Sequence, residues 1–197
     1  MAKNKVKYNI CNVHYAPITV AEDGTVSFAT PVAMQGAVSI SLDPNGEPES
    51  FYADGVEYYT INNNQGYDGD LELAMIPEGF RTDVLMETPD ANKVLVENSN
   101  SQTGSFALLF EFDGDVRKIR HVLYNCSASR PNISSKTNEE SKEVQTETLA
   151  LKSRPMSDGL VKAKTGDMTT ETVYTNWYKD VYKPSVTAAT NTTTGSK

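Results

Sequence analysis

Two histidines, His14 and His121, are the side chains of this chain best suited to proton transfer near neutral pH. His121 lies in a predicted strand between Ile119 and Leu123, where we expect a hydrogen-bonded structural histidine. His14 lies in a predicted N-terminal arm, where an interface or solvent-facing position is expected. Neither has a cysteine or serine motif beside it, although folding can bring a distant carboxylate to His121. A hydrolase that uses His121 with such a carboxylate is therefore kept as an alternative.

Two groups of carboxylates raise the question of metal binding. The run that holds Asp68, Asp70 and Glu72 lacks the remaining spaced oxygens of a calcium loop. Asp113 and Asp115 flank a glycine at a predicted hairpin tip, where aspartate suits the turn itself. The scattered glycines match neither a dinucleotide fingerprint nor a phosphate loop. We therefore expect no catalytic residues, no metal site, no cofactor and no enzymatic activity.

The two cysteines, Cys11 and Cys126, are too few and too far apart for a disulfide scaffold or a zinc site. We expect both to be free thiols. The first ten residues hold three lysines with no apolar run behind them, so no signal peptide is expected. No segment approaches the roughly 20 apolar residues of a membrane span, so membrane insertion is not expected either.

The net charge of −8, from 26 acidic and 18 basic residues, disfavours tight binding to a phosphate backbone. Solubility is its simplest interpretation, and it is also compatible with a surface that stays near DNA without adhering to it. The hydrophobic fraction of 38% is low for a compact chain of 197 residues. Many residues are therefore expected in loops or arms, while ten tyrosines and six phenylalanines argue against general disorder.

Aromatic and turn-forming residues gather between Phe51 and Phe80, in a stretch without histidine, cysteine or lysine. A second aromatic group lies near the C-terminus. Tyrosine is common where protein surfaces meet, because it buries area and keeps a hydroxyl for water or a partner. Trp177 fits a core position equally well. The candidate residues for a subunit interface are Tyr52, Tyr58, Tyr59, Tyr67, Tyr174, Trp177, Tyr178 and Tyr182.

The clearest secondary-structure signal is a hairpin over 106–125, in which alternate large apolar residues begin at Phe106 and Asp113-Gly114 supplies the turn. One face of this hairpin is expected to be packed and the other polar, as in the sheet of a sandwich or barrel. A second hairpin is predicted with Asp54-Gly55 at its turn.

The predicted organisation has three parts: an N-terminal arm over 1–20, a β-sandwich domain over 21–167 and a C-terminal arm with a Thr-rich tail over 168–197. Within the domain, 42–70 is expected to be an extended inter-subunit loop and hairpin. A short helix is expected over 77–86, since Pro77 suits a first turn and Thr88-Pro89 ends the pattern.

Several strings along the chain resemble the major tail protein, or tail tube protein, of long-tailed bacteriophages (siphophages) of Gram-positive bacteria. Each string alone is a weak signal, and their common order and spacing carry the resemblance. The strings are Phe51-Tyr-Ala-Asp, Gly66-Tyr-Asp-Gly-Asp-Leu-Glu, Ile76-Pro-Glu-Gly-Phe, Phe106-Ala-Leu-Leu-Phe-Glu-Phe-Asp-Gly-Asp, Val122-Leu-Tyr-Asn-Cys-Ser-Ala-Ser-Arg-Pro and Trp177-Tyr-Lys-Asp-Val-Tyr-Lys-Pro.

The resemblance implies a mainly β fold, a β-sandwich or barrel-like tail tube fold with one short flanking α-helix, long loops and terminal arms. It implies a structural virion protein whose hexameric rings stack into a tail tube, the conduit for ejection of double-stranded DNA. The implied partners are further copies of the chain, a tape measure protein, tail-tip and tail-terminator proteins, and DNA in transient, non-specific passage. The implied location is the virion tail, after synthesis in the host bacterial cytoplasm.

Elementary physical chemistry is compatible with such an assembly. A ring covers exposed sheet edges that otherwise invite aggregation, and long loops and arms can reach neighbouring rings. We expect the segment 42–70, the N-terminal arm and the segment from Met168 onward to carry inter-subunit contacts, and the rest to fold without 168–197. The alternative from a different class is a carbohydrate-binding β-sandwich of a phage tail tip, with exposed aromatic side chains as sugar platforms.

An acidic lumen would repel DNA phosphates and let the duplex slide. Our candidates for lumen-facing acidic residues, chosen for the net charge and for their place beside the strongest strands, are Asp113, Asp115, Glu139, Glu140, Glu143 and Glu147. Charge reversal at lumen positions is expected to slow DNA ejection and to leave tube length unchanged. Ejection kinetics measured on purified virions test this hypothesis, and unchanged kinetics would remove it.

Overall fold

Antiparallel strands are the main secondary structure of the computed structural model, which describes residues 3–137 and 143–185. Two helices of six residues each complete it. The strands are β1 Lys7–Val20, β2 Val26–Phe28, β3 Val32–Ala33, β4 Ala37–Asn45, β5 Glu49–Ala53, β6 Val56–Ile61, β7 Gly66–Leu73, β8 Thr88–Pro89, β9 Leu95–Val96, β10 Phe106–Gly114, β11 Ile119–Ala128, β12 Glu147–Ser153 and β13 Lys162–Lys164, and the helices are α1 Glu78–Asp83 and α2 Glu171–Asn176.

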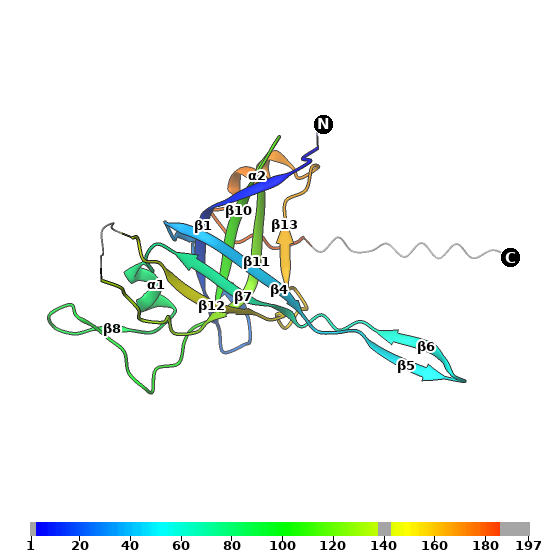
Figure 1. Ribbon diagram of the computed structural model, residues 1–197, viewed down its shortest axis with the longest axis horizontal. Helices are drawn as coiled ribbons and strands as arrows, with labels where there is room; N and C mark the ends of the chain where they lie inside the picture. Colours follow the sequence, from blue (N-terminus) through cyan, green and yellow to red (C-terminus); the bar gives the residue numbers. More distant parts are fainter. Residues whose placement is uncertain (1–2, 138–142, 186–197) are drawn as a thin grey trace.

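The main sheet has the strand order β2-β1-β10-β11-β12-β7-β4, with β13 beside β11 and β3 beside β1. It folds over at β11. This strand pairs with β10 from Ile119 to Cys126, while its other edge pairs with β13 at His121–Leu123 and with β12 at Cys126–Ala128. The strands β4 and β7 consequently cross in front of β10 and β11 (Figure 1). The chain is mainly β and sandwich-like, as the sequence predicts, and within the described residues the sheet does not close into a barrel.

The first hydrophobic core lies between these two layers and is closed at one end by α1. Side chains alternate along β10, so that Phe106, Leu108 and Phe110 all enter this core. Phe80, the buried residue of α1, packs edge-on against Phe106, with ring centroids 5.2 Å apart, and against Tyr15 at 5.1 Å. These T-shaped contacts fix the position of the helix on the sheet.

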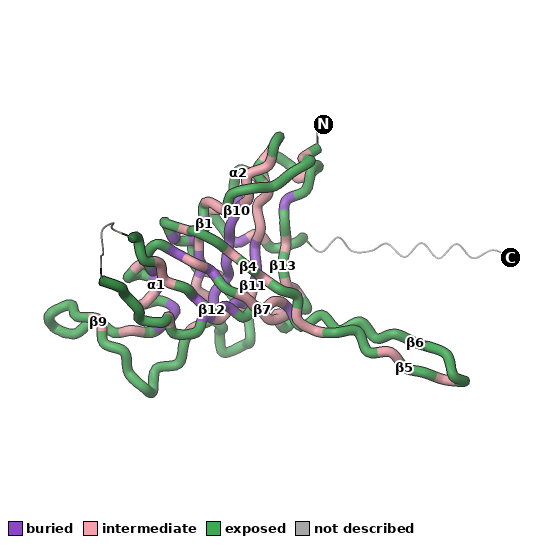
Figure 2. Tube along the Cα trace, viewed as in Figure 1, coloured by how far each residue is buried: buried purple, intermediate pink, exposed green. Residues whose placement is uncertain are grey.

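A second core covers the opposite face of β10 and β11, where the sequence suggests a polar surface. Ala107, Leu109 and Val122 are fully buried there, beneath Trp177 and Val181 of the C-terminal segment. The hairpin is therefore packed on both faces, and Figure 2 shows buried residues along both of its strands. The difference arises because the segment after α2 returns across the sheet, a long-range contact that a strand pattern does not contain.

A buried carboxylate ties this segment to the sheet. Glu111 on β10 is 3% exposed and accepts a hydrogen bond from Arg120 Nε at 3.0 Å and one from Lys118 Nζ at 3.0 Å. The hydroxyl of Tyr178 donates to Glu111 Oε2 at 3.3 Å, and burial together with the charge of Glu111 raises the pKa of Tyr178, so it stays a donor. The guanidinium of Arg120 also lies 3.8 Å from the ring centre of Tyr174. Both cations compensate a charge that would be costly to bury alone.

The N-terminal segment is part of the sheet. The expected arm over 1–20 contains the 14-residue strand β1, which pairs with β10 from Lys7 to Pro17 and buries Val13 and Tyr15. Strand β1 carries two breaks in register beside β10, and Asn9 and Asn12 there have positive φ. These irregularities explain why its apolar residues do not alternate cleanly in the sequence.

Helix α1 is shorter than the predicted 77–86. It begins after Pro77 as expected, but its backbone has left the helical conformation before Pro89 can act. Met86 has a left-handed φ of 59°, and the carbonyl of Val84 accepts a hydrogen bond from Gly104 N at 2.7 Å instead of continuing the helix. The strand β8 that follows pairs with β9.

Because Trp177 and Val181 close the second core, the C-terminal segment does not behave as the detachable arm that the sequence suggests. Replacing Trp177 by Ala is expected to lower the free energy of unfolding by about 3–5 kcal/mol, the usual cost of removing a large buried aromatic side chain. Urea unfolding followed by circular dichroism measures this. The matched control is Tyr58→Ala at a 72% exposed position, expected to change stability by less than about 0.5 kcal/mol. Equal effects of the two variants would contradict the packing described here.

Candidate functional site

The hairpin formed by β5 and β6 projects away from the body of the protein (Figure 1). Its turn residues Asp54 and Gly55 have φ values of 53° and 77°, the two successive positive angles of a type I′ turn. The hairpin and turn predicted from the sequence are confirmed. Such a turn matches the twist of the two strands and gives the ribbon a defined shape.

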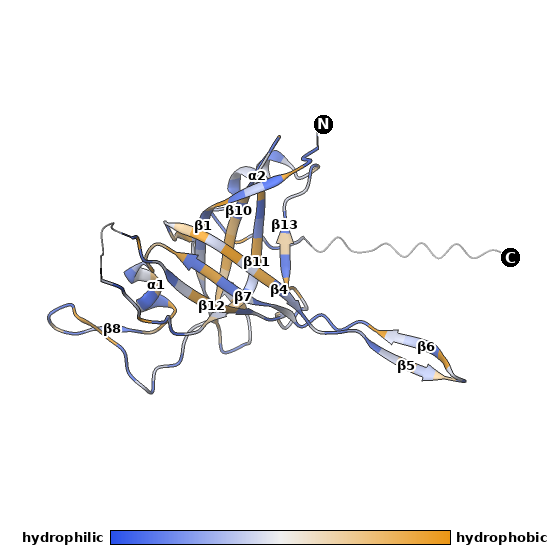
Figure 3. Cartoon of the chain, viewed as in Figure 1, coloured by the Kyte–Doolittle hydropathy of each residue, from blue (hydrophilic) through white to orange (hydrophobic). Residues whose placement is uncertain are grey.

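Large apolar side chains on this hairpin are exposed to solvent. Their exposed fractions lie between 51% and 72%, and Figure 2 shows almost the whole ribbon as exposed. Tyrosine ranks as mildly hydrophilic on the hydropathy scale, so the ribbon is mostly pale in Figure 3 despite its aromatic area. A two-stranded ribbon alone is marginally stable, and an exposed patch of this kind marks an interaction surface. The side chains are Phe51, Tyr52, Val56, Tyr58, Tyr59 and Ile61.

One face of the ribbon forms an apolar strip. Phe51 lies directly opposite Tyr59, and Glu49 lies opposite Ile61, so all four side chains share a face. On the other face, Glu57 accepts hydrogen bonds from Ser50 and Thr60 of the same hairpin. Ser50, Glu57 and Thr60 thus bond to one another within the ribbon, whereas the apolar strip of Phe51, Tyr59 and Ile61 is left uncovered.

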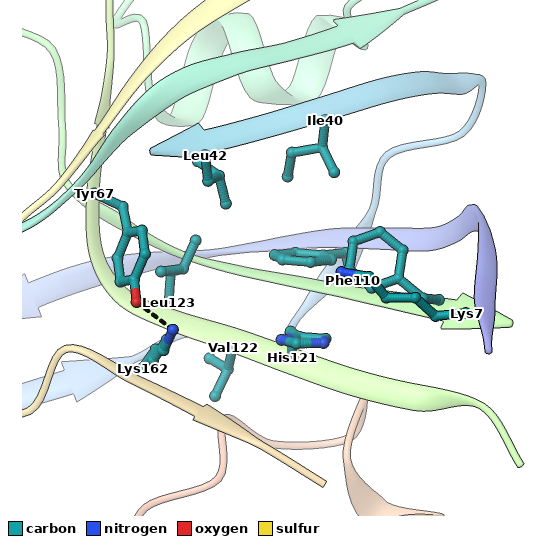
Figure 4. A pocket seen from close by; sticks show the side chains of 10 residues that line it. Lys7, Ile40, Leu42, Tyr67, Phe110, His121, Val122, Leu123 and Lys162 are labelled. Carbon is teal, nitrogen blue, oxygen red and sulfur yellow. Dashed lines mark hydrogen bonds between the residues drawn. The ribbon is translucent and has the colours of Figure 1, made fainter. Parts of the chain in front are cut away.

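The fourth tyrosine candidate of the first group, Tyr67, lies at the base of the hairpin in β7 and is half-buried. It lines a cleft of about 250 Å³ between β4 and the β10–β11 hairpin (Figure 4). The walls are mostly apolar, and lysines stand at the opening. The lining residues are Lys7, Ile40, Leu42, Tyr67, Phe110, Phe112, His121, Val122, Leu123 and Lys162.

Cations stand over aromatic rings at this cleft. Lys7 Nζ lies 4.9 Å from the ring centre of Phe112, and Lys162 Nζ lies 4.3 Å from that of Tyr67 and donates to its hydroxyl. Lys164 is a third positive charge near His121. Among residues 3–137 and 143–185, these three lysines form no ion pair with a carboxylate. The cleft therefore combines an apolar floor with uncompensated positive charge.

His121 lies in the wall of this cleft, stacked on Phe110 with the ring centroids 5.1 Å apart and the planes 2° from parallel. Burial lowers its pKa to about 4, and the charges of Lys164, Lys7 and Lys162 add to this shift. The imidazole is therefore neutral at pH 7. The stack agrees with the structural role expected from the sequence, but within the described residues the His121 ring is held by stacking and not by the expected hydrogen bond. The hydrolase alternative needs a carboxylate in the place where lysines stand.

The second aromatic group is used within the protomer. Tyr174 packs under Arg117 and Arg120, and Tyr178 lies against Glu111 and His14. Trp177 is 2% exposed, and Tyr182 stacks on it at 5.5 Å. These four aromatic residues anchor the C-terminal segment; Tyr174, Tyr178 and Tyr182 remain partly exposed.

The acidic candidates occupy different places. Asp113 forms an ion pair with Lys118 at 3.2 Å, and Asp115 accepts a hydrogen bond from Lys5 N at 2.9 Å. Glu147 pairs with Arg81 at 2.8 Å and accepts from Ile76 N, so it fixes the start of the α1 segment. Glu143 is exposed. Glu139 and Glu140 lie outside the described residues, and which face lines a lumen stays a prediction.

The remaining carboxylates and thiols have local roles. Asp68 pairs with Arg154 at 2.6 Å, and Glu72 accepts hydrogen bonds from Ser39 and Thr146. Across the described ranges, no three histidine, cysteine or acidic side chains gather as a metal site would require. Cys11 and Cys126 are free, as predicted. Neither helix in the described residues has the length and apolarity needed to span a membrane.

Sequence reasoning missed the lysines of the cleft and two members of the apolar strip, Phe51 and Ile61. Lys162 and Lys164 alternate on the short strand β13, which brings both to one face, and this spacing is visible in the sequence. The sequence does not show that these lysines lie near β4, because that proximity depends on how the two layers of the sheet cross.

The low pKa of His121 makes stability depend on pH. The unfolded chain takes up a proton at this residue near pH 6.5, whereas the folded chain takes it up only near pH 4, so stability is lost as pH falls through this window. Relative to His121→Phe, which keeps the stack on Phe110, the native protein is expected to lose on the order of 3 kcal/mol between pH 7 and pH 4. Urea unfolding at both pH values measures the difference. A constant difference between the two proteins would contradict a buried neutral imidazole.

No family model matches the chain, and no curated protein matches it. Among solved structures, the chain is similar to the anti-feeding prophage cap, described as a tube terminating cap and solved by cryo-electron microscopy. The match has 12% identity and a TM-score of 0.44, and it covers 82% of this chain and 93% of that chain. A likeness of this size does not assign the chain to a family.

Proposed function

We propose that this chain is a structural subunit of the tail tube of a long-tailed bacteriophage, which assembles with copies of itself into stacked rings. The observation that carries the proposal is the projecting β5–β6 hairpin with its uncovered aromatic strip. The sequence strings that resemble tail tube proteins give this surface its context, because the first of them, Phe51-Tyr-Ala-Asp, lies in the hairpin itself.

The edge of the sheet supports self-association as well. Strand β4 ends the main sheet and, within the described residues, pairs only with β7. Over Ala37–Asn45 its outer backbone groups are available to another strand. A second copy that supplied such a strand would extend the sheet, and repetition of one such contact around an axis closes a ring.

The function proposed for the assembly is conduction of double-stranded DNA through a hollow tube built of hexameric rings. A tape measure protein inside the growing tube and tail-tip and tail-terminator proteins at its ends are its proposed partners. The role is structural and not enzymatic. A surface of net negative charge suits a conduit, since DNA that does not bind its wall can slide along it.

The second candidate is a carbohydrate-binding module of a tail tip, because exposed tyrosines such as Tyr52, Tyr58 and Tyr59 can also stack on sugar rings. The two functions differ in the state of the purified protein. Glycan binding by a monomer favours the module, and polymerisation into tubes favours the conduit. Negative-stain microscopy with and without a tail-tip complex, combined with a glycan array, separates them.

Replacing Tyr58 and Tyr59 by Ser is expected to abolish tube formation and to leave the fold of the monomer intact, since both side chains are more than 60% exposed. Tube formation is followed by sedimentation and microscopy, and the fold by circular dichroism.

The control for this variant is Val144→Ser, which also removes an exposed apolar side chain but lies outside the hairpin. It is expected to assemble like the native protein. Normal tubes from the tyrosine variant would contradict a role of the hairpin in assembly, and failure of the native protein to polymerise even with a tail-tip nucleus would contradict the proposed function.

A further inference from the structure

We propose that the apolar strip of the β5–β6 hairpin docks into the lysine-rimmed cleft between β4 and the β10–β11 hairpin of a second copy of the chain. This inference rests on the proposed self-assembly and names the two surfaces that meet.

Both surfaces are apolar at their centres. The strip presents Phe51, Tyr59 and Ile61. The cleft presents Ile40 and Leu42 from one layer, both only partly buried in the protomer, and aromatic residues of the opposite layer (Figure 4). Docking would remove both apolar surfaces from water, which is the main driving force for association of such patches.

The surfaces are opposite in charge at their edges. The segment from Gly46 to Gly66 contains four acidic residues, Glu47, Glu49, Asp54 and Glu57, and neither lysine nor arginine. Lys7 and Lys162 line the cleft, and Lys164 lies directly across the strands from His121 of its wall; none of the three has a carboxylate partner in the described part of the chain. Opposite charges around an apolar centre guide the encounter and fix its orientation.

The geometry of the hairpin favours the cleft of another molecule over the cleft of its own protomer. Its two strands are joined to β4 and β7 by the short connections 46–48 and 62–65, and Leu42 of β4 and Tyr67 of β7 line the cleft of the protomer. The ribbon leads away from the body (Figure 1), and its six-residue strand β6 spans roughly 20 Å. A return into its own cleft would break the pairing at its base, whereas a second copy meets the ribbon as it stands.

Charge reversal on each side, followed by a swap, tests the docking. Lys162→Glu with Lys164→Glu is expected to abolish tube formation in sedimentation and microscopy, and so is Glu47→Lys with Glu49→Lys, at two exposed positions away from the Glu57 contacts. The chain that carries all four substitutions is expected to form tubes again, because the complementary pairs are restored. Lys136→Glu with Glu22→Lys, at exposed positions outside both surfaces, is the matched control and should assemble normally.

The outcomes separate this inference from the proposed function. Tubes from the native protein together with normal tubes from both single-sided variants would overturn the docking and leave the function standing. Loss of assembly in both single-sided variants and in the swapped chain would also overturn it, provided circular dichroism shows all three folded. If the variants do not fold, carbodiimide cross-linking of native tubes decides. Mass spectrometry must then find Glu47 or Glu49 joined to Lys162 or Lys164, and the absence of these pairs among the cross-links found overturns the docking.

Discussion

Coverage of the β10–β11 hairpin on both faces is the constraint on which the rest of the structure depends. One face receives the layer of β4, β7 and β12, and the other receives the C-terminal segment with Trp177. Because Glu111 is buried on the second face, two basic side chains and a tyrosine must lie beside it. Half of the aromatic residues that look free in the sequence are therefore committed within the protomer, and the uncovered aromatic surface is concentrated on β5 and β6.

Local sequence patterns predicted the turns and strands whose conformation depends on neighbouring residues in the chain. The turn at Asp54-Gly55 is visible in the sequence because positive φ requires these residue types. The alternation along Phe106–Gly114 predicted a strand with one apolar face, and the strand is there. Its second packed face escaped prediction, since Ala107 and Leu109 are buried by residues some seventy positions away. Tertiary contact, and not propensity, decides such a surface.

The candidate site was predictable in the same uneven way. Tyr52, Tyr58 and Tyr59 follow from composition, because tyrosines in a turn-rich stretch lack a core to enter. The cleft cannot be predicted from composition, since it exists only where β4 crosses β10 and β11. Glu147 shows the opposite failure: a carboxylate that resembles a free surface charge is held by Arg81 and the backbone of Ile76. The charged residues of a sequence do not reveal which carboxylates form ion pairs or hydrogen bonds within the folded protomer.

The short connections that join the ribbon to β4 and β7 have a mechanical consequence. Strand β7 pairs with β12 at seven consecutive positions, from Tyr67 opposite Ser153 to Leu73 opposite Glu147. A pull on the hairpin acts along the axis of these strands, so it loads their ladder of hydrogen bonds in shear and all at once. Antiparallel strands peel apart easily when opened from one end, but they resist sliding. A filament joined through such ribbons would transmit tension from subunit to subunit without unravelling the sheets that bear it.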